Sequence, residues 1–238
     1  MKKILGVLMA AALCSATDAA AANCNDVPSA SELRQAMLAA AKISNAGGLF
    51  GGARMWGAVV NRDGEICAYI TTTADPTQVW PGSQAIAKAK AYTANAFSLD
   101  TLALSTARLY TFTQPGHSLW SLGQSNLWHP SLNAAPGGQA GGTNQIGGGL
   151  IFFGGGVPIY RGTKIVGGLG ISGDTSCADH EIAKRTRNEL NLNPPGGALV
   201  DDITYSVPDG PSVFTHPRCL NTWRNGVFIG EEAVASGY

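Results

Sequence analysis

The sequence predicts an α+β fold in which one antiparallel sheet is covered by helices. Two observations lead to this prediction. Strand-like runs follow one another through short turns, first at Ala53–Val60 and Glu65–Thr73 and later at Val157–Arg161 and Lys164–Ile171. Helix-like segments stand before, between and after these pairs. This order of elements is typical of an antiparallel sheet with helices packed on it.

The N-terminal part of the chain predicts a helix followed by a hairpin. Ser29-Ala-Ser-Glu32 fits a capping box, so we expect a helix over Ser29–Ile43 that Gly47-Gly48 terminates. The residues Asn-Arg-Asp-Gly at 61–64 include types that tolerate a positive φ, which predicts the tight turn of a hairpin. The other expected elements are a helix over Ser83–Phe97 with Ser83 as its N-cap, a short helix at Thr101–Tyr110, a long loop at Thr113–Gly149, a strand at Leu150–Phe153, a final helix at Cys177–Leu190 capped by Asp174 or Ser176, and one further strand at Ile203–Val207.

The first 22 residues have the pattern of a secretory signal peptide. Two lysines follow Met1, an apolar run covers Ile4–Leu13, and small residues continue to an expected cleavage site near Ala20–Ala22. The apolar run is too short to span a bilayer, and no second long run follows it. We therefore expect a periplasmic or secreted protein without a membrane span.

The chain has few charged residues, and the numbers of basic and acidic residues are equal. The chain has 16 basic and 16 acidic residues, and charged residues make up 13% of the 238 residues. A protein that binds nucleic acid usually needs a basic surface to neutralise phosphates. The sequence therefore predicts no nucleic-acid partner.

Five cysteines are present, and Cys14 lies within the expected signal peptide. Four cysteines would then remain, and an even number in an exported chain predicts two disulfides. The residues alone leave three connectivities open.

Three partial motifs in the second half of the chain are incomplete. Residues 168–173 match GxGxxG, but no later strand carries the acidic residue that a dinucleotide site needs, so we interpret these glycines as sites of close backbone approach. Residues 170–173, with Ser172 in the third position, resemble the start of a GxSxG nucleophile elbow, but the fifth position is Asp174 instead of glycine. His180-Glu181 lacks the second histidine of a zinc-protease motif.

Two blocks of the sequence together show a family pattern. The first block contributes Ser83, Ala87, Lys88, Ala89, Thr93, Ala94 and Phe97. The second contributes Gly154, Gly155, Gly156, Pro158, Gly167, Gly170, Ser172, Gly173, Asp179 and Ala183. In this order they resemble the GlcG/HbpS family of haem- and cofactor-associated domains, the DUF336 type. The resemblance covers roughly residues 55–190.

The resemblance implies a profilin-like or PAS-like five-stranded antiparallel sheet flanked by helices. We accordingly expect a signal peptide at 1–22, a GlcG/HbpS-like domain at 23–192 that includes the loop at 113–149, and a C-terminal extension at 193–238. Set against this domain, the favoured disulfides are Cys177–Cys219, which would fasten the extension to the domain, and Cys24–Cys67, which would fasten the N-terminal segment.

The resemblance also implies haem, or a related planar cofactor, as the ligand, and it allows a homo-oligomer. The expected pocket lies between the helix at 83–97 and the strand end at 167–173. Its predicted cofactor-binding residues are Lys88, Gly170, Ser172, Asp179, His180 and His216. His180 and His216 are the predicted iron ligands, because imidazole is a common axial donor and a bridge from Cys177 to Cys219 would bring the two rings together. Other donors that stay open are His117, His129, Tyr92 and Met55.

Two alternatives come from other classes of function. One is an enzyme that acts on a small carboxylated or oxidised substrate, with Asp179, His180 and Lys88 as acid–base groups. The other is an interaction module without a cofactor, which would use the loop at 113–149.

Overall fold

Two antiparallel hairpins build the central sheet. The computed structural model describes residues 23–125 and 148–234. The first hairpin is β1 (Trp56–Asn61) with β2 (Ile66–Thr71), and the second is β3 (Gly156–Arg161) with β4 (Lys164–Ser172). The strand order is β2-β1-β4-β3, so β1 and β4 pair at the centre of the sheet.

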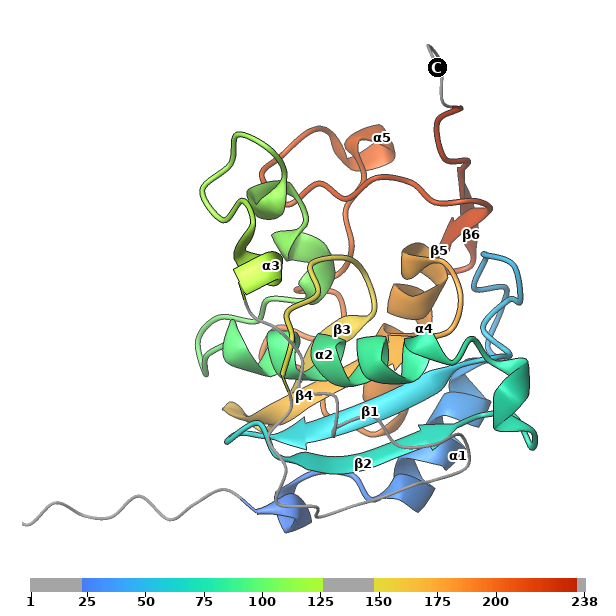
Figure 1. Ribbon diagram of the computed structural model, residues 1–238, viewed down its shortest axis with the longest axis vertical. Helices are drawn as coiled ribbons and strands as arrows, with labels where there is room; N and C mark the ends of the chain where they lie inside the picture. The colour runs from blue at the N-terminus through green and yellow to red at the C-terminus, as the bar shows by residue number, and fades with distance from the viewer. Residues whose placement is uncertain (1–22, 126–147, 235–238) are drawn as a thin grey trace, which may run out of the picture.

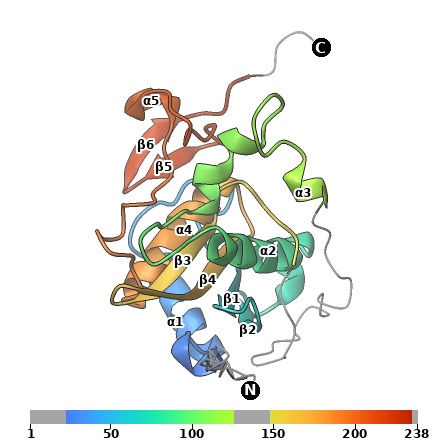
Figure 2. The ribbon, with the colours of Figure 1, turned by 90° about the vertical axis from the view of Figure 1, so that its left-hand side faces the viewer.

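Helices cover both faces of this sheet. α2 (Gly82–Ala96) lies on one face, whereas α1 (Ala30–Ala40) and α4 (Ser176–Glu189) lie on the other (Figures 1 and 2). Successive strand residues point to opposite faces. Ala58 therefore packs toward α2 with Ala87, while Val59 packs in the cluster that α1 and α4 complete. Both faces are apolar, which places the core on either side of β1 and β4.

The predicted capping box and the predicted hairpin turn are confirmed. Ser29 Oγ accepts the amide proton of Glu32 at 3.3 Å, and the Glu32 carboxylate accepts that of Ser29 at 2.8 Å. Gly64 in the hairpin turn has φ +86°. The two other predicted caps are wrong. α4 is capped by Thr175, and α2 begins at Gly82 without a side-chain cap, so Ser83 lies inside the helix.

The predicted five-stranded sheet is wrong, because the sheet has four strands among residues 23–125 and 148–234. The expected strand at Leu150–Phe153 does not pair with the sheet. The Ile151 amide instead donates to Thr93 Oγ1 at 3.0 Å, and Leu150 and Phe152 pack with Leu109 in a separate cluster. This segment therefore passes beside α2 rather than extending the sheet. The expected strand at Ile203–Val207 forms only an isolated bridge, from Thr204 to Thr215.

The remaining elements are short. They are α3 (Leu122–Ser125), α5 (Ser206–Asp209), β5 (Thr222–Arg224) and β6 (Val227–Gly230), with 3₁₀ helices at Cys24–Asp26, Pro76–Gln78, Thr106–Leu109 and Thr111–Thr113. The 3₁₀ helix at Thr106–Leu109 replaces the helix expected at 101–110. The predicted signal peptide and residues 126–147 of the predicted loop lie outside the described residues. Within residues 23–125 and 148–234, no helix has the length and apolar character needed to cross a membrane.

The C-terminal segment from 193 to 234 runs alongside α4 (Figure 1). Both favoured disulfides are present: Cys24 joins Cys67, and Cys177 at the start of α4 joins Cys219 in this segment. An isolated bridge from Thr222 to Gly47 also ties the segment to the loop after α1. The extension is thereby held against the outer side of α4.

Candidate functional site

The contact between α2 and β4 is made backbone to backbone. A Cβ at Gly168 would lie 2.1 Å from the carbonyl oxygen of Ala91, and a Cβ at Gly170 would lie 2.0 Å from that of Ala87. Glycines at these positions let the helix lie directly on the strand. The structure thus leaves no room for a planar cofactor between α2 and β4 at Gly170. Ser172 lies buried at the end of β4, opposite Trp56.

Asp179 forms an ion pair with Lys90, a lysine that is not among the predicted site residues. Lys90 Nζ lies 2.7 Å from Asp179 Oδ2 and also donates to the Ile171 carbonyl at 3.0 Å, and both charged side chains are almost fully buried. Burial raises the pKa of Asp179 to about 6, although Lys90 opposes the shift, and burial lowers the pKa of Lys90. The alternation of lysine and alanine in α2 could have indicated Lys90, because residues 88 and 90 point to different sides of a helix.

Lys88, which was selected, lies elsewhere. Its ammonium group stands 4.0 Å from the centre of the Tyr69 ring, and burial lowers its pKa to about 8. Tyr69 belongs to β2, the edge strand beside β1. The structure therefore pairs Asp179 with Lys90 and places Lys88 over Tyr69.

The two predicted iron ligands flank the same glycine, Gly154. The Gly154 amide donates to His216 Nε2 at 3.2 Å, and a Cβ at Gly154 would lie 3.0 Å from His180 Cβ. His216 Nδ1 donates to the Pro217 carbonyl at 2.7 Å, so both ring nitrogens of His216 are engaged by the backbone. Burial lowers the pKa of His216 to about 4, and nearby His180 lowers it further while the bond to Pro217 opposes the shift. His216 is therefore neutral at physiological pH.

His180 is equally enclosed. The Ile203 amide donates its proton to two acceptors, His180 Nε2 at 3.1 Å and Asp202 Oδ1 at 2.9 Å. His180 Nδ1 is buried and has no hydrogen-bond partner among the described residues. The structure thus brings His180 and His216 to one place, as the sequence predicted, but neither ring opens onto solvent.

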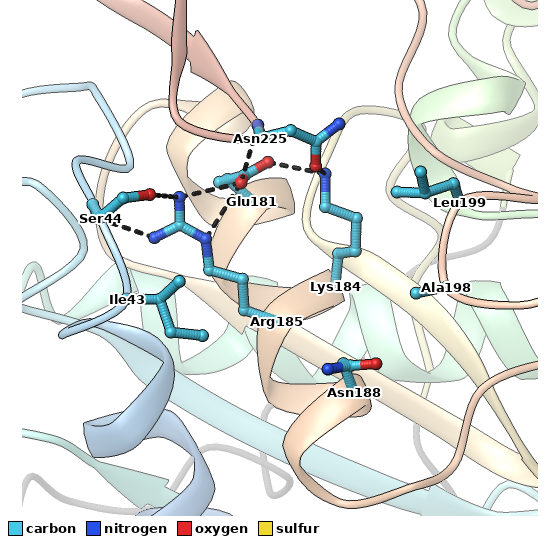
Figure 3. A pocket seen from close by; sticks show the side chains of 9 residues that line it. All are labelled: Ile43, Ser44, Glu181, Lys184, Arg185, Asn188, Ala198, Leu199 and Asn225. Carbon is cyan, nitrogen blue, oxygen red and sulfur yellow. Dashed lines mark hydrogen bonds and ion pairs between the residues drawn. The ribbon is translucent and has the colours of Figure 1, made fainter.

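The outer side of α4 carries a charged cavity of about 310 Å³ (Figure 3). Lys184 Nζ binds Glu181 at 2.7 Å, Asp202 at 3.0 Å and Asn225 at 2.8 Å. Arg185 binds Glu181 and the backbone and hydroxyl of Ser44. The two cations of this cavity are balanced by the carboxylates of Glu181 and Asp202, and the three ammonium protons of Lys184 are all in hydrogen bonds. These contacts therefore mainly join α4 to the loop after α1 and to the extension.

A second opening is lined by aromatic rings, and we call it the aromatic groove. Its volume is about 240 Å³, and its aromatic walls are Tyr110, Trp120, Phe152 and Phe153. The Phe153 ring lies 5.0 Å from Lys90 Nζ, and the Tyr110 ring lies 5.0 Å from the ring of His216. The groove thus adjoins the buried residues selected from the sequence.

The residues of the aromatic groove were missed by sequence reasoning, although the unusual length of the loop at 113–149 indicated a functional segment. The exposed residue His117 lies in the turn between Gln114 and Trp120, both of which line the groove. His129 lies outside the described residues.

A protein-family model matches this chain over most of its described core. The family model described as haem degrading protein HbpS-like matches residues 28–187. The chain belongs to this HbpS-like family. The resemblance predicted from the sequence is therefore confirmed. The match ends inside α4, so His216, Cys219 and the rest of the extension lie outside it.

Several solved structures match this chain at low sequence identity. A PduOC:heme complex has 23% identity, covers 68% of this HbpS-like chain and 92% of its own, and superposes with a TM-score of 0.49. The Klebsiella pneumoniae protein ORFY has 23% identity, coverage of 67% and 88%, and a TM-score of 0.47. A double mutant of Streptomyces reticuli HbpS has 20% identity, coverage of 79% and 99%, and a TM-score of 0.43. No curated protein matches the chain.

Proposed function

We propose that this protein is an exported haem-binding member of the HbpS-like family and that the planar cofactor binds at the aromatic groove. The observation that supports this site is the gathering of Tyr110, Trp120, Phe152 and Phe153 around one open cavity. Flat aromatic walls favour a flat, largely apolar ligand. Bound haem would supply a redox-active iron, whose chemistry depends on the axial donor and the polarity around it.

Among the described histidines, we favour His117 over the buried His180 and His216 as the axial donor to the haem iron. An axial donor needs a free lone pair on the cofactor side. His216 would have to give up a backbone hydrogen bond to offer one, and His180 would have to leave the Ile203 amide or turn its enclosed Nδ1 outward. His117 does not line the groove, but it is exposed at the turn between the lining residues Gln114 and Trp120, so its ring could turn toward a ligand without leaving a buried position. The roles of His180 and His216 as iron ligands stay predictions that the same experiment tests.

The proposal includes export, cleavage of residues 1–22, and two parts: a domain at 23–192 and a tethered extension at 193–238. Two disulfides support export, because such bridges persist in oxidising compartments. A homo-oligomer also stays a prediction. The alternative enzyme is less well supported, because Asp179 is paired with Lys90 and Lys88 lies over Tyr69.

The test is a haemin titration of the mature, oxidised protein, followed by absorbance in the Soret region. We expect saturation at about one haem per chain. Trp120→Ala should weaken binding by about tenfold or more, because removal of a central aromatic anchor commonly costs over 1 kcal/mol. Trp80→Ala is the matched control, because Trp80 is similarly exposed (49% against 52%) and does not line the groove.

The ligand is found by single changes at His117, His129, His180 and His216. The Soret maximum should move for His117→Ala and stay in place for His216→Gln. A flat titration of the folded protein would rule out haem binding. Saturable binding that Trp80→Ala and Trp120→Ala weaken equally would rule out the groove.

A further inference from the structure

A group of metal-ligand residues lies at the junction of α4 and the extension. The ligand atoms of Cys177, His216 and Cys219 all lie within 4.8 Å of one another, and all three residues are buried. Cys177 belongs to the first turn of α4, and the other two come from the extension outside the family match. The three residues are therefore brought together by the extension and are a property of this chain.

Two buried polar atoms near this group have no hydrogen-bond partner among the described residues. They are His180 Nδ1 and the hydroxyl oxygen of Tyr205. His180 follows Cys177 by three positions on α4, which places the two on neighbouring turns of one helix side. Tyr205 packs in the same buried cluster as Cys177 and Cys219. Unpaired buried polar groups are rare in native proteins and often mark a missing water or ion.

The surroundings of the two sulfurs suit thiolates. The Cys177 amide, at the N-terminal end of α4, donates to Cys219 Sγ at 3.2 Å, and Ser176 Oγ lies 3.3 Å from the same sulfur. Helix N-termini stabilise negative sulfur. His216 is oriented by its bond from Nδ1 to the Pro217 carbonyl, the kind of backbone contact that commonly fixes a metal-binding imidazole. Its Nε2 accepts the Gly154 amide proton in the oxidised protein, so a metal at Nε2 would replace that hydrogen bond.

We propose that reduction of the Cys177–Cys219 disulfide turns this group into a site for Zn²⁺ or a similar borderline metal, with Cys177, Cys219 and His216 as ligands. Two thiolates and one imidazole form a known zinc ligand set, and a fourth ligand would complete a tetrahedron. His180, with its unpartnered nitrogen, or a water takes that fourth position. The site does not depend on haem, because three ligands belong to the chain and the fourth is His180 or water.

The chemistry balances with an external dithiol as the reductant. The dithiol gives two electrons and two protons to the protein disulfide, becomes a disulfide itself, and leaves two protein thiols. Binding of the metal then releases the two thiol protons, because cysteine binds metal as the thiolate. In the oxidised protein the two sulfurs are bonded to each other, so the site exists only after reduction.

The test uses Co²⁺ as a spectroscopic probe on the full mature chain without haem. A phosphine serves as the reductant, because it lacks thiols that compete for metal. A second group at Cys24, Glu65 and Cys67 has similar ligand spacing, so all measurements use a Cys24→Ser/Cys67→Ser background. We expect one Co²⁺ per reduced chain with sulfur-to-metal charge-transfer absorption, and no such band in the oxidised chain.

Three variants define the ligands in this background. Cys177→Ser/Cys219→Ser should abolish the band. His216→Gln should weaken binding by about tenfold or more, and His117→Gln, an exposed histidine elsewhere, should leave it unchanged. His180→Gln weakens binding if His180 is the fourth ligand and leaves it unchanged if water is.

The proposal is overturned by equal Co²⁺ binding before and after reduction or by binding that survives Cys177→Ser/Cys219→Ser. A reduced chain that unfolds without metal is also informative. Added Zn²⁺ must then restore a cooperative unfolding transition, and failure to do so equally overturns the proposal.

Discussion

α2 and the extension are both packed onto the central domain, but by opposite means. α2 lies on the sheet through small residues, with Gly168 and Gly170 touching its backbone. The extension lies on α4 through buried ion pairs, such as Arg187 with Asp201, and through the Cys177–Cys219 disulfide. The first contact depends mainly on close backbone packing, with one buried ion pair of Lys90 and Asp179 beside it. The second depends on several ion pairs and on the oxidation state of two cysteines. Conditions such as pH and redox potential should therefore act on the extension first.

The largest loss of stability is expected from a change that breaks a buried ion pair of the extension. Arg187 binds Asp201 through two short bonds, at 2.8 and 2.6 Å, and both residues are buried. Asp201→Asn leaves an unpaired buried charge and should lower the free energy of unfolding by about 3–5 kcal/mol, measured by urea denaturation. Lys164→Gln is the control. Its pair with Asp100 is exposed and screened by solvent, so this change should affect the free energy of unfolding much less. Equal effects would contradict the comparison.

The two disulfides offer a matched pair. Their sequence separations are 42 and 43 residues, so loop-closure entropy predicts nearly the same loss, about 4 kcal/mol, when either is removed. The difference should appear locally. Cys177→Ala/Cys219→Ala should speed amide hydrogen exchange in residues 202–224, and Cys24→Ala/Cys67→Ala should not. Faster exchange of that segment in both variants would show that the bridge at α4 is not what holds it.

The third prediction concerns acid. His216 has a folded pKa of about 4 against an unfolded value of 6.5, so below pH 6.5 the unfolded chain takes up the proton first. Stability is therefore lost as the pH falls from 6.5 toward 4, by up to about 3 kcal/mol from this residue. The raised pKa of Asp179 acts in the opposite direction over part of this range. The measurement is accordingly the difference between the oxidised wild type and His216→Gln, which should shrink as the pH falls.

The smallest effect tests the packing of α2. Gly170→Ala places a methyl group against the Ala87 carbonyl and should cost about 1–3 kcal/mol in thermal unfolding. Gly82→Ala, at the start of the same helix, meets no atom within 4 Å and should be neutral or stabilising by up to about 1 kcal/mol. A Gly170→Ala variant as stable as the wild type would contradict the direct contact of helix and strand.

Local signals explain which elements the sequence predicted well. The capping box at Ser29 and the turn at 61–64 act within a few residues, and both are confirmed. The segment Leu150–Phe153 has the composition of a strand, but its neighbours decide its pairing. Its contacts with Thr93 and Leu109 come from distant parts of the chain, and no local pattern encodes them.

The candidate site shows the same division. Asp179, His180 and His216 could be selected from the sequence because acids and imidazoles are recognisable by type. Their partners could not, because Lys90 pairs with Asp179 across 89 positions and Gly154 binds His216 across 62. Lys88, which was selected, lies over Tyr69, and its role as a cofactor-binding residue stays a prediction. Only the way α2 lies on the sheet decides which of two neighbouring lysines is buried against a carboxylate.

The sequence by itself determined the family, the antiparallel hairpins and the three main helices. It left three disulfide connectivities open, of which the family resemblance favoured the one that the structure has. The tertiary structure alone decided the number of strands, the closed contact at Gly170, the aromatic groove and the enclosure of both histidines. The physical reason is the distance along the chain between the residues that interact. Capping, turn formation and hydrophobic periodicity act between residues close in the chain, whereas burial, ion pairing and cavity shape depend on groups that only the folded backbone brings together.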